Sequence, residues 1–204
     1  MPPQVKDRLA AVFLFFYPSF LSLCHRVAPA QLWQHKGISP AQLYRMIMIR
    51  PAMPEDIPTL WMLRTHAVRT LCAAHYSADQ IACWTSLPAP ARSYRTMIEA
   101  GSALVAEEAR GLYGYALLKL DNGEVEGLFV DPAHGRRGIG TQLLDALEDI
   151  AIAQHLNRLK LFAALNAVAF YQANGFAAIR AERFPHPSGI TLESVYMEKP
   201  LRHD

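Results

Sequence analysis

The spacing of apolar residues beyond the first quarter of the chain switches between the period of helices and that of strands. Apolar side chains recur every three or four positions over 54–72, which predicts an amphipathic helix there. Ser77 and Gln80 match the capping box S-x-x-Q, so a second helix is expected to begin at Ser77 and to end by Pro88. A third helix is predicted over 91–100. The apolar stripe of the first helix consists of Ile57, Leu60, Leu63, Val68 and Leu71.

Runs of apolar and β-branched residues predict strands at 103–108, 112–120 and 124–130. The sequences EEARG and DNGE between these runs are typical of hairpin turns, which indicates an antiparallel meander. A short strand is also predicted at 46–50, before the first helix. The remaining predicted elements are a helix at 138–155, a strand at 158–164, a helix at 167–173 and strands near 176–182 and 191–199.

Residues 1–45 follow a different pattern. Two basic residues precede an apolar run, residues 9–23, which a proline interrupts and which is shorter than the roughly 20 residues of a membrane-spanning helix. The run resembles the apolar part of a signal peptide, and an A-x-A cleavage site is present at 28–30. The alternative is that these residues are an accessory or mis-called extension, with the true start at Met46 or Met48.

Composition limits the classes of function. A length of 204 residues suits one domain, and a net charge of +2, from 20 Lys and Arg against 18 Asp and Glu, is too balanced to indicate nucleic-acid binding. The three cysteines, Cys24, Cys72 and Cys83, are odd in number and lack the spacing of metal ligands. We therefore expect buried or idle thiols in a reducing compartment, and no metal site.

The segment DPAHGRRGIGTQLL, residues 131–144, places glycines and arginines where a predicted strand gives way to an amphipathic helix. The first N–H groups of a helix carry partial positive charge and lack internal partners, and glycine lets a ligand approach them closely. Gly138 and Gly140, with the charges of Arg136 and Arg137, therefore predict a phosphate or pyrophosphate site, with a simple tight turn as the alternative. The spacing matches neither the P-loop nor the dinucleotide fingerprint.

Residues 127–148, GLFVDPAHGRRGIGTQLLDALE, resemble the acyl-CoA-binding motif of the GNAT superfamily of N-acetyltransferases, Q/R-x-x-G-x-G/A after a strand. Gly135 stands where glutamine or arginine is usual, so one pyrophosphate contact would come from the backbone alone. Residues 166–176, NAVAFYQANGF, resemble the second motif of the family. The resemblance covers about residues 46–200. It implies an α/β (α+β) fold, the GNAT fold: a central mixed, mostly antiparallel sheet with a splayed strand pair, flanked by helices.

The resemblance implies acetyl-CoA as co-substrate, and no metal. Backbone groups of the splayed strand would pair with the pantetheine arm, and an N–H there would polarise the thioester carbonyl. Asn166 would cap the short helix that follows it. The residues expected to bind acetyl-CoA are Leu128, Phe129, Val130, Arg136, Arg137, Gly138, Ile139, Gly140, Thr141 and Asn166.

Two catalytic residues are also implied. By spacing alone Tyr171 would be a core aromatic residue, but it matches the family's general acid, whose phenol protonates the departing thiolate. Glu126 is the preferred base, because it lies nearer the expected thioester than Glu124. Strand periodicity places both glutamates on one face with Leu128 and Val130. Glu124 or a water chain is the alternative base.

The predicted function is acetyl transfer from acetyl-CoA to a primary amine, of a small molecule or a protein, by direct attack on the thioester. A non-catalytic acyl-CoA sensor or partner subunit is the alternative from another class. His75, Tyr76 and His186 are candidates for the acceptor pocket. No nucleic-acid partner and no stable membrane association are expected, and a homodimer is left open.

Localisation follows from the co-substrate. Acetyl-CoA is cytoplasmic, so a cytoplasmic protein is expected. This favours residues 1–45 as an N-terminal extension rather than an export signal. The N-acetyltransferase domain is then predicted to span 46–204.

Overall fold

The computed structural model describes residues 47–88, 91–108 and 111–202, and the predictions for residues 1–45 lie outside these ranges. Within them, no helix is long and apolar enough to cross a membrane. The strands are β1 (Met48–Pro51), β2 (Ala103–Glu108), β3 (Gly111–Lys119), β4 (Glu124–Val130), β5 (Arg158–Ala164), β6 (Ala177–Pro185) and β7 (Thr191–Pro200). The helices are α3 (Ile57–Leu71), α4 (Ala78–Trp84), α5 (Ala91–Glu99), α6 (Ile139–Ala153) and α7 (Val168–Ala173), with 3-10 turns η4 (Pro54–Asp56), η5 (Pro132–His134) and η6 (Leu165–Ala167).

The predicted capping box of α4 is confirmed. The Ser77 hydroxyl accepts a hydrogen bond from the Gln80 N–H at 3.2 Å, and the Gln80 side chain accepts one from the Ser77 N–H at 3.0 Å. Both hairpins of the predicted meander are also present, because β2 pairs with β3 and β3 with β4, each antiparallel. Local sequence signals therefore account for most elements of the first half of the domain.

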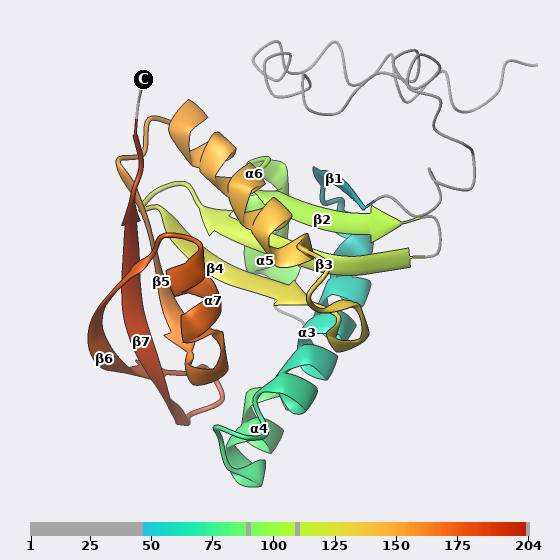
Figure 1. Ribbon diagram of the computed structural model, residues 1–204. Helices are drawn as coiled ribbons and strands as arrows, with labels where there is room; N and C mark the ends of the chain where they lie inside the picture. Colours follow the sequence, from blue (N-terminus) through green and yellow to red (C-terminus); the bar gives the residue numbers. More distant parts are fainter. Residues whose placement is uncertain (1–46, 89–90, 109–110, 203–204) are drawn as a thin grey trace, which may run out of the picture. The chain divides into compact units, whose positions relative to one another are not determined.

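The strand order is β1-β2-β3-β4-β5-β7-β6, and only β4 and β5 pair in parallel. This arrangement confirms the predicted mixed, mostly antiparallel sheet. Helix α6 crosses one face of β2, β3 and β4, while α3 and α5 pack on the opposite face (Figure 1). Alternate residues of β3 serve the two faces: Tyr115 and Leu117 pack with α3 and α5, whereas a Cβ on Gly114 would meet Ile139 and Leu143 of α6.

β4 and β5 are joined at a single residue pair, Glu124 with Lys160. Beyond this pair β4 continues along β3 as far as Val130, and β5 continues along β7 as far as Ala164. The two strands therefore diverge toward their C-terminal ends, which confirms the predicted splayed pair. The edge of β4 that faces β5 is left without a neighbouring strand over most of its length.

β4 also contains a bulge. Leu117 and Leu118 of β3 lie opposite Gly127 and Val125, which leaves Glu126 as an extra residue in β4. The predicted alternation of the two strand glutamates with the apolar residues that follow is therefore wrong, because the bulge interrupts the period of two. It also makes Glu126 more exposed than its neighbours in the strand.

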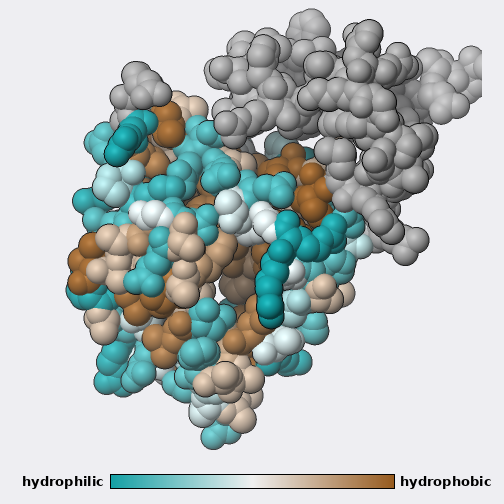
Figure 2. Space-filling model, in the orientation of Figure 1, coloured by the Kyte–Doolittle hydropathy of each residue, from teal (hydrophilic) through white to brown (hydrophobic). Residues whose placement is uncertain are grey.

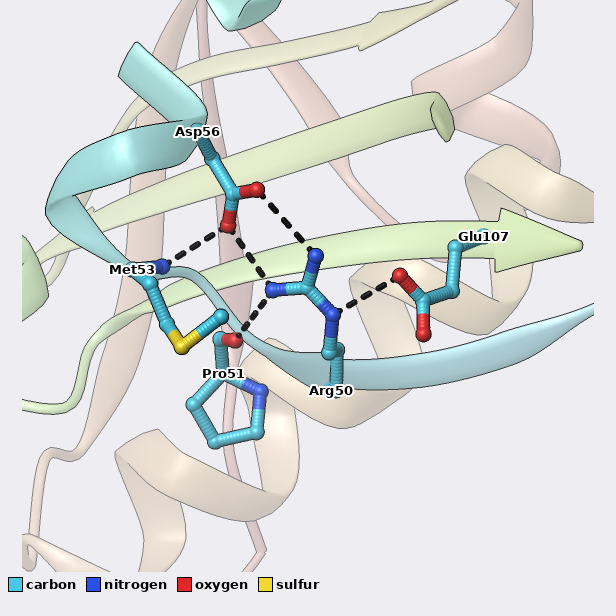
Figure 3. Close-up of polar contacts among 5 residues, drawn as sticks. All are labelled: Arg50, Pro51, Met53, Asp56 and Glu107. Carbon is cyan, nitrogen blue, oxygen red and sulfur yellow. Dashed lines mark hydrogen bonds and ion pairs between the residues drawn. The ribbon is translucent and has the colours of Figure 1, made fainter. Parts of the chain in front are cut away.

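A partly buried network of hydrogen bonds around Arg50 connects the start of α3 to the sheet (Figure 3). The Arg50 guanidinium donates to both carboxylate oxygens of Asp56, at 2.8 and 3.1 Å, and to Glu107 of β2 at 2.8 Å. Asp56 also accepts from the Met53 N–H at 2.8 Å. Burial acts to raise the pKa of Asp56, but the hydrogen bonds from Arg50 and Met53 outweigh it and lower the pKa.

Candidate active site

A cavity of about 740 Å³ lies where β4 and β5 diverge, and its walls include residues of both strands. On the face seen in Figure 2, a hollow lies near the middle of the described part, bordered by both hydrophobic and hydrophilic residues. Almost all the predicted site residues share this one cavity. Those that line it are Glu126, Leu128, Phe129, Val130, Arg136, Gly138, Ile139, Gly140, Thr141, Asn166 and Tyr171.

The turn before α6 presents a row of backbone N–H groups. Arg136, at φ 58°, and Gly138, at φ 76°, both adopt the left-handed conformation. The first helical hydrogen bond runs from the Gln142 N–H to the Gly138 carbonyl, and the N–H groups of 136–141 donate to no described residue. Left-handed residues in such a turn direct successive N–H groups into one concave surface that suits an anion. Together with the helix dipole, these groups can hold a phosphate.

The two sequence motifs contact each other. A Cβ on Gly140 would lie 3.1 Å from the ring of Phe170, on α7. A Cβ on Gly138 would have its nearest neighbour 3.7 Å away, so Gly138 is required for its φ rather than for space. The packing of Phe170 on Gly140 places α7 against the first turn of α6. It thereby fixes the position of the adjacent Tyr171.

The two arginines of the turn have different environments. Arg136 lines the cavity, whereas Arg137 does not. The Arg137 guanidinium bonds the carboxylate of Glu108, on β2, at 2.5 Å. In this structure Arg137 therefore contacts a carboxylate outside the cavity, and its contact with a pyrophosphate stays a prediction.

The free backbone groups of β4 belong to Leu128 and Val130. The Asp131 N–H donates to the Tyr113 carbonyl at 2.8 Å, so residues an even number of positions away, including Phe129, also turn their backbone groups to β3. By the same alternation, Leu128 and Val130 direct theirs to the side where β5 has diverged. Phe129 was expected to bind through its backbone, but its backbone groups face β3, although the residue lines the cavity.

Tyr171 is 7% exposed, and its ring lies 5.1 Å from that of Phe170 and 5.5 Å from that of Phe176. Its hydroxyl donates to no described residue, and the side chain lines the cavity. Burial raises the pKa of Tyr171 well above the ordinary value for tyrosine, so the phenol keeps its proton across the physiological range. Core packing and a role as proton donor are compatible in this position.

Glu124 and Glu126 share one cation, Lys119 of β3. The Lys119 ammonium lies 2.9 Å from Glu124 and also contacts Glu126. Burial acts to lower the pKa of Lys119, but its hydrogen bonds to the two carboxylates outweigh this and raise the pKa. Both glutamates line the cavity, and the side chain of Glu126 is 35% exposed against 18% for Glu124. Glu126 is thus the carboxylate more open to an incoming ligand.

Asn166 does not cap α7 as predicted. The N-cap is Ala167, without a side-chain hydrogen bond, and Asn166 lies in the preceding 3-10 turn. Its side-chain oxygen accepts instead from the Cys72 thiol at 3.3 Å. Burial raises the pKa of Cys72 to about 11, so this cysteine is a thiol rather than a thiolate near pH 7. Among the described residues, no group of three or more His, Cys, Asp or Glu side chains is placed to hold a metal ion.

Two of the three residues predicted for the acceptor pocket lie at the cavity, and the third does not. Tyr76 and His186 line the cavity, whereas His75 is exposed and lies outside it. The Tyr76 hydroxyl donates to the Glu193 carbonyl at 2.6 Å and accepts from the Leu165 N–H at 3.0 Å. Tyr76 therefore joins β7 to η6, and its hydroxyl is already engaged.

The sequence analysis missed a group of cavity residues on α3, α4 and α5. Arg64 is 7% exposed and lies on the apolar stripe of α3, four residues after Leu60 and four before Val68. A charged residue on a buried stripe is unusual, and this was the available signal. The other members of the group are Trp61, Trp84 and Tyr94.

Residues 72–193 match the family described as the acetyltransferase (GNAT) domain. The match covers more than half of the chain and includes both motifs identified above. The chain therefore belongs to the GNAT family of N-acetyltransferases, and the resemblance stated from the two motifs is confirmed.

Individual relatives support the same assignment. The chain is 26% identical over 157 residues to YafP, an uncharacterized N-acetyltransferase of Escherichia coli K12, which covers 77% of this chain and 98% of YafP. It is 35% identical over 106 residues to an IAA acetyltransferase of Azospirillum brasilense, which covers 48% and 67% of the two chains.

Solved structures share the fold. A GCN5-related N-acetyltransferase from Rhodopseudomonas palustris has a TM-score of 0.65 and 28% identity, covering 76% of this chain and 95% of its own. The PaiA N-acetyltransferase of Thermoplasma acidophilum, solved in complex with coenzyme A, has a TM-score of 0.62 and 23% identity, covering 76% and 99%. The sheet with its diverging strands is thus the architecture of known N-acetyltransferases.

Proposed function

We propose that this protein transfers the acetyl group of acetyl-CoA to a primary amine of a small molecule or a protein, by direct attack of the amine on the thioester. The observation that carries the proposal is one cavity into which the turn before α6, the free edge of β4 and Tyr171 all open. The coenzyme A complex of the fold neighbour PaiA N-acetyltransferase supports the choice of co-substrate.

The residues present fit coenzyme A in two places. Its pyrophosphate matches the N–H groups of 136–141 and the charge of Arg136, because both favour an anion. Its pantetheine arm carries amides that can pair with the free edge of β4 at Leu128 and Val130. A backbone N–H of that edge can also stabilise the oxyanion that forms at the thioester carbonyl.

The reaction needs one proton acceptor and one donor. As the amine nitrogen bonds to the carbonyl carbon, its proton passes to Glu126, directly or through water, with Glu124 as the alternative base. When the C–S bond breaks, the sulfur takes the proton of the Tyr171 hydroxyl. Cys72 has no role as a nucleophile in this scheme, since burial raises the pKa of its thiol to about 11 and keeps it protonated near pH 7.

The test is release of free coenzyme A from acetyl-CoA in the presence of a panel of primary amines. The wild-type protein is expected to release it only when an acceptor is present. Tyr171→Phe keeps the ring packing and removes the proton donor, so kcat is expected to fall by roughly 10²-fold while the Kd for acetyl-CoA is unchanged. Because the pKa of Tyr171 is raised, wild-type activity is expected to persist when the pH exceeds the pKa of an ordinary tyrosine.

Two results would contradict the proposal. Tight binding of acetyl-CoA without turnover on any amine would favour a non-catalytic acyl-CoA sensor. Full activity in Tyr171→Phe would show that the thiolate leaves unaided or finds another acid.

A further inference from the structure

Arg64 is a buried guanidinium at the cavity wall without a counter-ion. It lies on α3, is 7% exposed, and lines the cavity. Its contacts are long and uncharged: the Trp84 carbonyl at 3.4 Å and the His186 ring nitrogen at 3.4 Å. Its guanidinium carbon also lies 4.3 Å above the ring of Trp61.

Arg50 is an arginine of this protein whose charge is balanced by carboxylates. Arg50 donates to the carboxylates of Asp56 and Glu107, at distances near 2.8 Å. In the ranges 47–88, 91–108 and 111–202, no carboxylate pairs with Arg64, although Arg64 is the more buried of the two arginines. The two glutamates of β4 contact Lys119 and form no ion pair with Arg64.

A buried cation without a partner opposes folding. Transfer of a charge out of water is costly unless a counter-ion compensates, and a guanidinium cannot escape this cost by losing its proton. His186 offers no negative charge: burial, and then the nearby charge of Arg64, lower its pKa, so its ring is neutral near pH 7. Because the hydrogen bonds of Arg64 are long and none is to an anion, its N–H groups can take two oxygens of one anion.

We propose that Arg64 is the binding site for a carboxylate, and that the amine acceptor of the reaction proposed above carries one. The inference deepens that function and rests on it for the identity of the bound molecule. A carboxylate fits better than a bulkier anion because the Trp61 ring, the His186 ring and the Trp84 carbonyl all lie close to the guanidinium.

The same surroundings define the rest of the acceptor. Arg64 and Glu126 both line the cavity, which therefore contains a cation and a carboxylate. A ligand with a carboxylate at Arg64 and an amine toward Glu126 would have opposite charges at its two ends, matched to opposite charges in the cavity. Its body would be apolar or aromatic. The class is thus an amino acid-type amine with the two groups separated along the molecule.

The first experiment compares matched acceptors. Aminomethylbenzoate and short and long ω-aminoalkanoates are each assayed beside their primary amides, which keep the amine and remove the negative charge. For the acid that fits, we expect kcat/KM of the wild type to exceed that of its amide by about 10- to 100-fold, the scale of a charge-assisted hydrogen bond. In Arg64→Met, which keeps an apolar side chain of similar length, this ratio is expected to collapse toward one.

Arg69→Met is the matched control. Arg69 lies on the same helix, is exposed, and bonds Thr85 outside the cavity. Arg69→Met should leave the ratio of kcat/KM between acid and amide at the wild-type value. Amine acetylation without any preference for the acids, or a preference that survives Arg64→Met, would overturn the inference and leave the proposed function intact.

A second measurement needs no turnover. Phenylacetate and phenylpropionate, each beside its amide, are titrated by calorimetry into the protein saturated with coenzyme A. Carboxylate binding that Arg64→Met weakens by about 10-fold or more supports the site even if no amine is acetylated, a result that would count against the proposed function alone. Absence of carboxylate binding, or binding equal in Arg64→Met, overturns the site. So does a loss of coenzyme A affinity in Arg64→Met with carboxylate binding unaltered, which would make Arg64 a coenzyme A contact.

Discussion

Neighbouring residues in the turn before α6 have different surroundings. The backbone of 136–141 supplies the N–H groups, and the left-handed conformations of Arg136 and Gly138 direct them. The side chains differ, because Arg136 lines the cavity and Arg137 bonds Glu108. The sequence predicts one role for both arginines, whereas their side chains have different contacts in the structure.

Neutralisation of each arginine tests this difference. Arg136→Gln is expected to raise the Kd for acetyl-CoA by roughly 10-fold, since it removes a charge-assisted contact with a polyanion. The effect should be larger at low salt, where screening is weak. Arg137→Gln is the control and should change the Kd little. Calorimetry of both variants at two salt concentrations gives the answer, and equal effects would restore the original expectation for Arg137.

Glu126 can be tested through pH. Glu126→Gln removes the proposed base, so its loss of kcat/KM should be largest at low pH, where the amine is protonated. The loss should shrink as the pH rises and free amine appears, from about 10²-fold toward a small value. Glu124→Gln is the matched control, because Glu124 bonds the same Lys119 from the same strand. A wild-type pH–rate profile in Glu126→Gln would move the role of base to Glu124 or to a water chain.

At the scale of elements, polar contacts add to apolar packing at the start of α3, where Ile57 and Leu60 are buried. Arg50 of β1 connects Asp56, at the start of the helix, with Glu107 of β2. Because α3 also carries Arg64 and Trp61, this network positions one wall of the cavity. Its strength should depend on the charge of Asp56.

Asp56→Asn is expected to lower the free energy of unfolding by about 2 kcal/mol near pH 7, the scale of hydrogen bonds to a charged group. The folded-state pKa of Asp56 lies below its ordinary value, so its contribution is present above an unfolded pKa of about 3.9. This contribution is lost as the pH falls through the lower pKa that Asp56 has in the folded state. Urea unfolding of both proteins at neutral and acid pH tests this: the difference should disappear in acid. A difference independent of pH would mean that Asp56 acts without its charge.

The elements were predictable wherever the signal is local. The capping box at Ser77, the hairpin turns and the glycine turn before α6 each depend on a few adjacent residues, and the structure has the corresponding elements. The bulge at Glu126 was not predictable, because it depends on the register between two strands, which the sequence of either strand alone does not specify. Asn166 failed as a cap for a similar reason: its oxygen bonds Cys72, which is distant in sequence.

The site itself was predictable from the two motifs, but not its acceptor end. The motif residues gather around one cavity, as the family resemblance implied. Arg64 and Trp84 come from helices outside both motifs, and their meeting depends on how α3 and α4 pack beside the sheet. The one sequence signal was a charged residue on the apolar stripe of α3.

At the scale of the whole domain, the cavity forms because the two halves of the sheet are joined only at one end of β4 and β5. β1 to β4 form one half with α3, α5 and α6, and β5 to β7 form the other with α7. The halves share one residue pair between β4 and β5, and the cavity opens beyond it. The helix contact of Phe170 with Gly140 joins the halves on the side of the turn. The described elements thus build the cavity from both halves of one sheet.

This architecture makes a prediction about the first 45 residues. Every described residue that lines the cavity lies at position 61 or later, and the sheet begins at Met48. A chain that starts at Met46 is therefore expected to fold with the same midpoint of thermal unfolding and to bind acetyl-CoA with the same Kd as the full chain. Both are measured on the two purified proteins, with the full chain as the control. An insoluble short chain, or one that cannot bind acetyl-CoA, would show that residues 1–45 belong to the folded domain, and a mature protein cleaved after Ala30 and exported would overturn the cytoplasmic assignment.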